Sequence, residues 1–249
     1  MTFETMQSHE SVTLHYAGTD FRRQGLIALV SDHVTGKSVL DLRCLRGDLA
    51  VKLLKEGRSV SGLDGYQQAV SAANSSARAC GFEGEMACFW QLKNLAGHTA
   101  GSSFDTVLCI DLLNHVESDR ETLSEIHKVL HKDGELLLLV PAFPFLLGQR
   151  DRELGHLRRY SKSQIKALLA DTGFEAVSLR FWNALALIPY IFIERILGRK
   201  VSDKVRFGAA DPSSRLLGPL LRFWYRHIER HVLFPAGLSI FIVAKKKQR

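Results

Sequence analysis

Residues 38–64 read SVLDLRCLRGDLAVKLLKEGRSVSGLD, and this stretch decides the fold. The apolar run 39–42 predicts a buried strand, and a tight turn around Gly47 follows it. Apolar residues at helical spacing then predict a helix over 48–56, after which a second strand ends on the acid Asp64. This order is typical of the opening of a βαβ unit, whose first turn and second-strand carboxylate can hold a nucleoside.

Outward from this unit, short apolar runs alternate with amphipathic runs as far as residue 181, which indicates an α/β fold with a mostly parallel sheet covered on both faces. The predicted strands cover residues 38–42, 58–63, 84–89, 104–110, 135–140, 174–181 and 238–244. The predicted helices cover residues 21–33, 48–56, 66–80, 119–131 and 162–171. Lys132, Asp133 and Gly134 are expected to form a turn that ends the fourth of these helices.

An insertion at 183–235 separates the last two predicted strands. It opens with ten apolar residues, 184–193, which are too few to span a bilayer because a span needs about 20. A second helical run, 215–233, mixes leucine and aromatic residues with arginine. This pattern fits a lid packed over an active site and also a lid that touches lipid. We therefore divide the chain into a Rossmann-like core (1–182), a basic amphipathic helical lid (183–235) and a last core strand with a basic tail (236–249).

The net charge of +7 is unevenly placed. Residues 183–249 hold 13 Lys and Arg against 4 Asp and Glu, which is +9, and residues 1–182 hold 20 against 22, which is −2. This asymmetry favours an anionic partner, either a phosphate-bearing substrate or a membrane surface. A solvated basic face with a lysine-rich tail is the alternative.

Two further features bear on the compartment. Residues 1–12 are polar and acidic and lack the apolar core of a signal peptide, so we expect a cytoplasmic protein, with contact at the inner face of the membrane left open. The four cysteines, Cys44, Cys80, Cys88 and Cys109, are scattered without a C-x-x-C pair. Their spacing favours free thiols over disulfides, and no metal site is expected.

The turn at 43–48, Arg-Cys-Leu-Arg-Gly-Asp, lacks the G-x-G-x-x-G pattern that approaches a pyrophosphate, which argues against NAD or FAD. Together with Asp41 and Asp64, the turn resembles the S-adenosylmethionine (SAM) site of class I methyltransferases. The resemblance implies SAM as cofactor and a seven-stranded sheet with an antiparallel last strand. Where that family has glycine, this chain has Arg43 and Leu45. A side chain at a close-approach position costs about 1–3 kcal/mol, which weakens binding roughly tenfold to a hundredfold.

The resemblance also implies a set of cofactor-binding residues. Asp64 is expected to bind both ribose hydroxyls, with a cap on the helix that begins near Tyr66 as its alternative role. Gln91 is expected to accept a hydrogen bond from the adenine amino group, with a surface loop as its alternative. The full implied set is Asp41, Arg43, Leu45, Gly47, Asp64, Gly65, Gln91 and Asp111.

Leu113-Asn114-His115 follows the fourth predicted strand, where many class I relatives have Leu-Glu-His. The resemblance places this loop over the transferred methyl group, and His115 is a candidate general base since imidazole titrates near neutral pH. A residue that caps a helix or packs in a loop is the alternative for His115.

The segment 151–161 carries Asp151 and then Gly-His-Leu-Arg-Arg-Tyr-Ser at 155–161. It resembles a bacterial methyltransferase subfamily with a G-H-x-R-R-Y-S box, whose members often accompany polysaccharide or lipid-linked glycan genes. The adjacent arginines are candidates to clamp a carboxylate or phosphate. In the alternative interpretation the box is a structural loop in which Arg159 pairs with Asp151 and Tyr160 packs under the lid. The candidate sets are His115, His156 and Tyr160 for catalysis, and Asn114, Asp151, Arg158 and Arg159 for substrate binding.

Three functions follow from these patterns. The first is a SAM-dependent methyltransferase that acts on an anionic small-molecule or lipid-linked sugar acceptor. The second is a non-catalytic relative whose SAM binding has lapsed through Arg43 and Leu45 and which acts as a partner or regulator. The third is an enzyme of the same fold with different nucleoside chemistry. Nucleic acid is not an expected partner, since the chain has no N-P-P-Y box.

Overall fold

A computed structural model describes residues 21–82, 87–88, 94–99, 101–196 and 212–247. One sheet of seven strands runs through it in the order β3-β2-β1-β4-β5-β7-β6. The strands are β1 (Ser38–Asp41), β2 (Ser59–Asp64), β3 (Ala87–Cys88), β4 (Phe104–Ile110), β5 (Leu130–Pro141), β6 (Phe174–Trp182) and β7 (Ser239–Lys246). The predicted α/β sheet and its antiparallel last strand are confirmed, because β7 pairs antiparallel with both β5 and β6.

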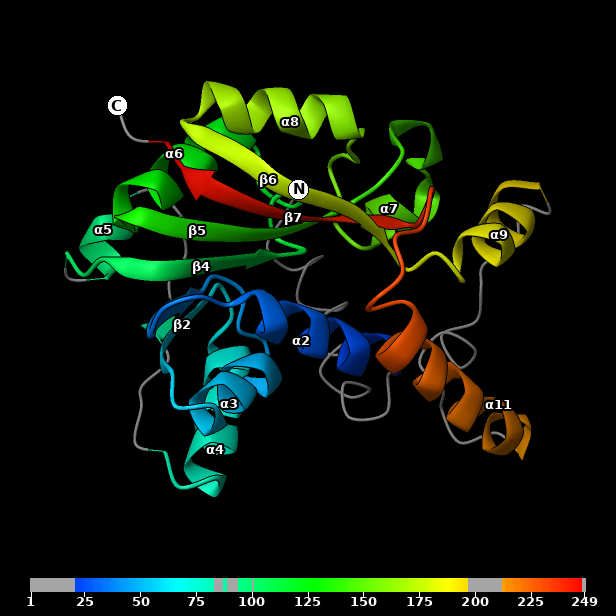
Figure 1. The fold of residues 1–249 in the computed structure, drawn as a ribbon, viewed down its shortest axis with the longest axis horizontal. Helices are drawn as coiled ribbons and strands as arrows, with labels where there is room; N and C mark the ends of the chain where they lie inside the picture. The colour runs from blue at the N-terminus through cyan, green and yellow to red at the C-terminus, as the bar shows by residue number, and fades with distance from the viewer. Residues whose placement is uncertain (1–20, 83–86, 89–93, 100, 197–211, 248–249) are drawn as a thin grey trace.

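Helices cover both faces of this sheet (Figure 1). One face carries α6 (Asp119–Val129) and α8 (Lys162–Asp171), and the other carries α2 (Phe21–His33), α3 (Asp48–Lys55) and α4 (Gln67–Ala79). The central strands are therefore apolar on both sides, as in the buried run from Leu136 to Val140. Short helices complete the chain: α5 (Leu95–His98), η1 (Pro144–Leu146) and α7 (Gln149–Glu153).

The predicted turn at 132–134 is wrong, because β5 begins directly after α6, at Leu130. Leu130 pairs with Phe104, and the register then jumps so that Thr106 pairs with Glu135. A bulge in β5 thus absorbs the extra residues. The bulge brings Leu130 and His131 close to Gly134. A Cβ at Gly134 would stand 2.9 Å from Leu130 Cδ2 and 3.0 Å from the His131 oxygen.

The insertion between β6 and β7 forms two helical rods at the carboxyl end of the sheet (Figure 1). The first is α9 (Leu187–Tyr190) with η2 (Ile191–Ile196), and the second is α11 (Pro212–Phe223) with η3 (Trp224–Ile228). The predicted helix 215–233 is present but begins and ends earlier. Among the described helices, none combines the length and apolarity needed to cross a membrane.

The second rod packs against α2, which fixes one end of the insertion on the core. A Cβ on Gly25 would lie 2.8 Å from Tyr225 Cβ, so only glycine permits this approach. The hydroxyl of Tyr225 donates to Asn183 Oδ1 at 2.8 Å, and Arg180 donates to the backbone oxygens of Glu229, Arg230 and Val232. The division into core, lid and last strand stays a prediction.

Candidate functional site

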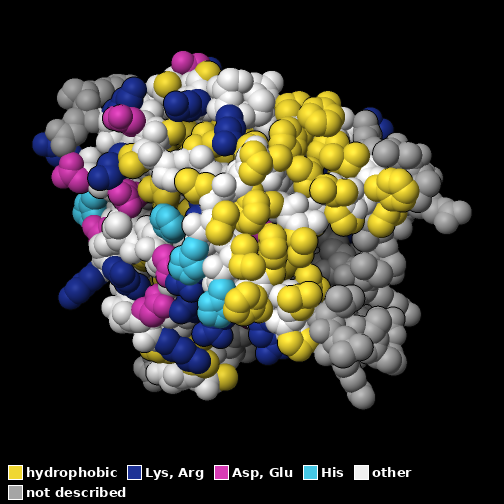
Figure 2. All heavy atoms as spheres, turned by 45° about the vertical axis from the view of Figure 1, so that its right-hand side comes forward, with side chains coloured by type: hydrophobic (Ala, Val, Ile, Leu, Met, Phe, Trp, Pro, Cys, Tyr) yellow, Lys and Arg dark blue, Asp and Glu magenta, His cyan; other side chains and the backbone are white. Residues whose placement is uncertain are grey.

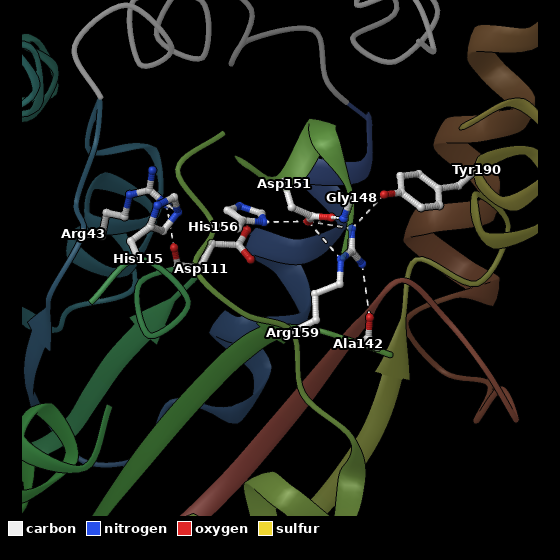
Figure 3. Close-up of polar contacts among 9 residues, drawn as sticks. All are labelled: Arg43, Asp111, His115, Ala142, Gly148, Asp151, His156, Arg159 and Tyr190. Atoms are coloured by element: carbon white, nitrogen blue, oxygen red, sulfur yellow. Dashed lines mark hydrogen bonds and ion pairs between the residues drawn. The ribbon is translucent and has the colours of Figure 1, made fainter. Parts of the chain in front are cut away.

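The candidate site lies where the loops after β1 and β4 meet. β1 pairs with β2 on one side and with β4 on the other. The order of strands therefore proceeds toward one edge of the sheet from β1 to β3 and toward the other edge from β4 onward. In open α/β sheets the crevice at such a switch point binds ligands. Arg43, in the loop after β1, spans this point (Figure 3): its Nη1 donates to the Asp111 carbonyl oxygen at 2.6 Å and to His115 Nε2 at 3.2 Å.

Asp64, at the end of β2, is 1% exposed. Its Oδ2 accepts the backbone N–H of Leu45 at 2.9 Å, and its Oδ1 accepts that of Tyr66 at 3.1 Å. Burial raises the pKa of Asp64, against the lowering effect of the Leu45 N–H and the Arg43 charge. The predicted alternative role of Asp64 as a helix cap is wrong, because Tyr66 is the N-cap residue of α4 and no described side chain caps this helix. The Tyr66 and Gly65 N–H groups also lower the pKa of Asp64, and a carboxylate has about four acceptor sites, so acceptor capacity remains.

The turn between β1 and α3 keeps an unusual backbone. Leu45 lies at φ 49° and Gly47 at φ 77°, both in the left-handed region. A Cβ on Gly47 would stand 3.0 Å from Ala73 Cα, which requires glycine there. Leucine is strained at φ 49°, and the bond from its N–H to Asp64 holds it in place.

Other members of the predicted cofactor set surround this turn. Asp41 is 2% exposed, and burial raises its pKa to about 7, although it accepts a hydrogen bond from the Arg43 N–H. Asp111 lies at φ 52°, and its N–H donates to the Leu139 oxygen. Gly65 follows Asp64 directly, and Gln91 lies outside the described residues.

His115 lies beside the guanidinium group of Arg43 and the ring of His156. Its ring meets that of His156 edge to face, with 4.8 Å between centroids. Burial, the Arg43 charge and His156 lower the pKa of His115 to about 2, so the ring is neutral at physiological pH. Arginine only donates, so Nε2 is the acceptor and the proton resides on Nδ1, which has no partner among the described residues. In this arrangement His115 is a poor general base.

This depressed pKa makes stability depend on pH. An unfolded His115 titrates near its ordinary 6.5, while the folded form stays neutral down to about 2. Below pH 6.5 the unfolded chain takes up a proton at His115 and the folded chain does not. The free energy of unfolding therefore decreases as the pH falls, by about 1–2 kcal/mol between pH 7 and pH 5. Chemical denaturation of the native chain and of His115→Gln at both pH values measures this difference. Equal losses in the two proteins would contradict the assignment to His115.

Asp151, in α7, forms the hub of a second polar group (Figure 3). It is 1% exposed, its Oδ1 accepts from Arg159 Nε at 2.9 Å and contacts His156 Nδ1 at 3.1 Å, and its Oδ2 accepts the Gly148 N–H at 2.9 Å. Burial alone would raise its pKa, but the bonds from His156 and Arg159 and the Arg159 charge hold the pKa at about 2. The predicted alternative pairing of Arg159 with Asp151 is confirmed.

The adjacent arginines of the box diverge. Arg159 also donates to the Ala142 oxygen at 3.1 Å, whereas Arg158 donates to the Glu117 oxygen at 2.7 Å and pairs with Asp119 at 3.1 Å. Both guanidinium groups therefore bind protein atoms from different segments. The predicted clamping of a carboxylate or phosphate by the two arginines stays a prediction, and it would require both groups to leave these partners.

Tyr160 packs in the main core and not under the described part of the insertion, contrary to the alternative interpretation. It is 4% exposed in the main core, and its hydroxyl donates to Asp119 Oδ2 at 3.1 Å and lies 3.3 Å from the Leu113 oxygen. Burial and the Asp119 charge raise its pKa above the usual range. Tyr160 thus serves as an anchor in this structure and is poorly suited to accept a proton.

The structure adds one residue to the site, Tyr190, and gives new evidence for another, Asn114. Tyr190 of α9 receives Arg159 Nη2 at 3.0 Å, and the Arg159 Cζ lies 5.3 Å from its ring centroid. It is the one hydroxyl in the apolar run 184–193, which was the available signal. Asn114 is fully buried, and neither its Oδ1 nor its Nδ2 has a partner among the described residues. Buried amides are normally satisfied, so this one is a candidate ligand contact.

Comparison with known proteins identifies the family. A methyltransferase domain model matches residues 15–179. The chain belongs to the methyltransferase domain family. The ubiquinone biosynthesis O-methyltransferase of Salmonella paratyphi A is 31% identical over 114 residues, which is 46% of each protein. A Geobacillus sp. (strain WCH70) protein named as a methyltransferase is 40% identical over 106 residues, 41% of each.

The match to these curated relatives spans about half their length. Among solved structures, magnesium protoporphyrin IX methyltransferase from Synechocystis PCC 6803 with bound S-adenosylhomocysteine (SAH) superposes with a TM-score of 0.54 at 18% identity, covering 94% of this chain and 84% of that one. At this identity the likeness supports the class I fold, in agreement with the strand order.

Proposed function

We propose that this member of the methyltransferase domain family transfers a methyl group from SAM to an anionic small-molecule or lipid-linked sugar acceptor. The observation that carries the proposal is the buried carboxylate of Asp64 at the tip of β2, inside a sheet of class I order. The positive charge of residues 183–249 supports an anionic acceptor. A relative named as a ubiquinone biosynthesis O-methyltransferase supports an acceptor oxygen.

The residues around the β1 turn fit the nucleoside part of SAM. Asp64 is held by two backbone donors and keeps acceptor capacity for the two ribose hydroxyls. Gly47 supports the turn where α4 approaches it. Arg43 bridges the loops after β1 and β4, so a ligand between these loops would compete with its bonds to Asp111 and His115.

SAM supplies a methyl group already activated by its sulfonium, so the protein's main tasks are to orient the acceptor and to exclude water. We assign the proton acceptor to His156 rather than His115. Its Nδ1 faces Asp151 Oδ1 at 3.1 Å, which orients the ring and leaves Nε2 as the basic nitrogen. Asn114, with an unpartnered buried amide, is proposed to bind the acceptor's polar group.

Calorimetric titration with SAM and SAH tests the proposal. The native chain is expected to bind both, and Arg43→Gly is expected to bind about tenfold more tightly, because the bulky side chain no longer competes for the crevice. Arg120→Gly serves as the control, since this exposed arginine lies in α6 and pairs with Asp171. If neither the native chain nor Arg43→Gly binds, the proposal fails.

The second candidate function is a non-catalytic partner or regulator with lapsed SAM binding. The bridge from Arg43 to Asp111 and His115 favours it, because it ties together the two loops that a ligand would separate. The same titration distinguishes the two functions. Binding that is absent in the native chain but restored in the double variant Arg43→Gly/Leu45→Gly would support the lapsed site.

A further inference from the structure

The insertion exposes an unusual number of large apolar side chains. Among the described residues, ten large hydrophobic side chains are exposed, and seven of them belong to the insertion. These seven, which we call the outer face, are Leu185 (40%), Ile188 (77%), Phe192 (54%), Leu220 (63%), Phe223 (55%), Val232 (45%) and Leu233 (73%). Figure 2, which brings the side with α9 and α11 forward, shows hydrophobic side chains gathered there in one area. Clusters of this kind mark sites of interaction with a protein or a membrane, whereas single exposed residues do not.

The opposite side of the insertion is already used for folding. Tyr225 is 6% exposed against α2, and Gly218 lies under the Phe21 ring. Trp224 donates to Glu229 Oε2 at 2.6 Å, which holds the indole toward the core. The second rod is thus amphipathic: Tyr225 and Gly218 pack against α2, while Leu220 and Phe223 are exposed.

The charges beside the outer face are positive. Arg222 and Arg226 are exposed on the same rod as Leu220 and Phe223, and the Arg222 Cζ also lies 4.9 Å from the centroid of the Phe21 ring in α2. The one acid in residues 212–235, Glu229, is 0% exposed, and its carboxylate accepts from the Ala184 N–H and the Trp224 indole. The described side chains of the insertion therefore present apolar groups and cations to solvent, and no acid.

We infer that the outer face docks on an anionic lipid surface. A bilayer supplies what these side chains lack, a hydrocarbon region for the leucine and aromatic groups and negative headgroups for the arginines. A protein partner would need an apolar surface with acidic groups at matching positions. An anionic bilayer offers hydrocarbon and negative headgroups without any fixed alignment of groups. The charge pattern therefore favours lipid.

The docking face is connected to the candidate site. Ile188 and Phe192 flank Tyr190 in the first rod, and Tyr190 receives the guanidinium of Arg159, which in turn binds Asp151. A docked bilayer would thus lie beside the Asp151–His156 pair. An acceptor carried on a lipid could reach this pair without leaving the membrane, although docking itself does not depend on methyl transfer.

Sedimentation of the purified full chain with vesicles tests the inference, in the absence of SAM and acceptor. The chain is expected to bind vesicles of phosphatidylcholine with phosphatidylglycerol, to bind phosphatidylcholine alone weakly, and to be released by salt. Ile188→Asp/Phe223→Asp is expected to lower the affinity at least tenfold. Val177→Asp, at a residue 57% exposed on β6, is the matched control and should bind as the native chain does.

A second pair of variants tests the charges without altering the apolar groups. Arg222→Gln/Arg226→Gln is expected to weaken binding to anionic vesicles roughly fivefold for each arginine. The inference is overturned if anionic and neutral vesicles bind equally, if the double aspartate variant binds like the native chain, or if Val177→Asp loses as much. A native dimer that the aspartate variant converts to monomer, with vesicle binding unchanged, would assign the face to a second copy. Calorimetry with SAM on the same variants tests the proposed function separately. Loss of vesicle binding with SAM binding retained concerns docking alone, whereas a native chain that docks but does not bind SAM contradicts only the proposed function.

Discussion

Asp64→Asn is expected to lower the affinity for SAH by roughly tenfold to a hundredfold, because hydrogen bonds to a charged group contribute about 1.5–3 kcal/mol. The asparagine has nearly the same shape, but its amide nitrogen cannot accept from a ribose hydroxyl. It also loses one of the two acceptors that now hold the Leu45 and Tyr66 N–H groups. Isothermal titration calorimetry measures the change directly.

Asp105 offers a matched control at the opposite end of the sheet. Its Oδ2 accepts the backbone N–H groups of Lys37 and Ser38 at 2.7 and 2.9 Å, much as Asp64 accepts two backbone donors. Because both donors meet one oxygen, the amide oxygen of Asp105→Asn can keep both bonds, and SAH affinity should stay unchanged. Equal losses in the two variants would mean that Asp64 acts through the fold alone, and the proposed ribose contact would be wrong.

The second large effect concerns the buried ion pair of Asp151 and Arg159. The two side chains are 1% and 7% exposed and lie 2.8 Å apart. Asp151→Asn leaves the Arg159 charge buried without its counter-charge, which costs about 3–5 kcal/mol. Urea unfolding monitored by circular dichroism should show this loss in the free energy of unfolding.

An exposed ion pair supplies the control for this measurement. Arg120 and Asp171 also lie 2.8 Å apart, but their side chains are 57% and 56% exposed. Asp171→Asn is expected to cost no more than about 1 kcal/mol, because water screens the pair. A similar loss for both aspartates would show that burial does not distinguish the pairs.

The pH dependence of Asp151 gives the same test a second readout. Its pKa falls from the ordinary 3.8 to about 2 in the folded chain. The stabilisation is thus fully present above pH 4 and is lost as the pH falls through 2. The difference in the free energy of unfolding between the native chain and Asp151→Asn should therefore become smaller from pH 4 to pH 2. The difference should stay constant between pH 5 and pH 7.

Much of the fold was predictable because its signals are local. The strand, turn and helix over 38–64, the strand 104–110 and the helix 162–171 follow from apolar spacing and from glycine at the turns. The sequence of 132–134 misled because Lys-Asp-Gly is a common turn, and a bulge in β5 depends on pairing with Phe104, which is distant in the chain.

The candidate site was less predictable from the sequence than the fold was. Sequence spacing alone determined that an acid ends β2, that a loop of candidate residues follows β4, and that positive charge gathers in the insertion. Only the tertiary structure decided that Arg43 reaches across 68 positions to Asp111, that Arg159 binds Asp151 and Tyr190, and that His115 stays neutral. The physical reason is that hydrogen-bond partners and desolvation depend on which segments the fold brings together, whereas strand and helix periodicity is present in the chain before it folds.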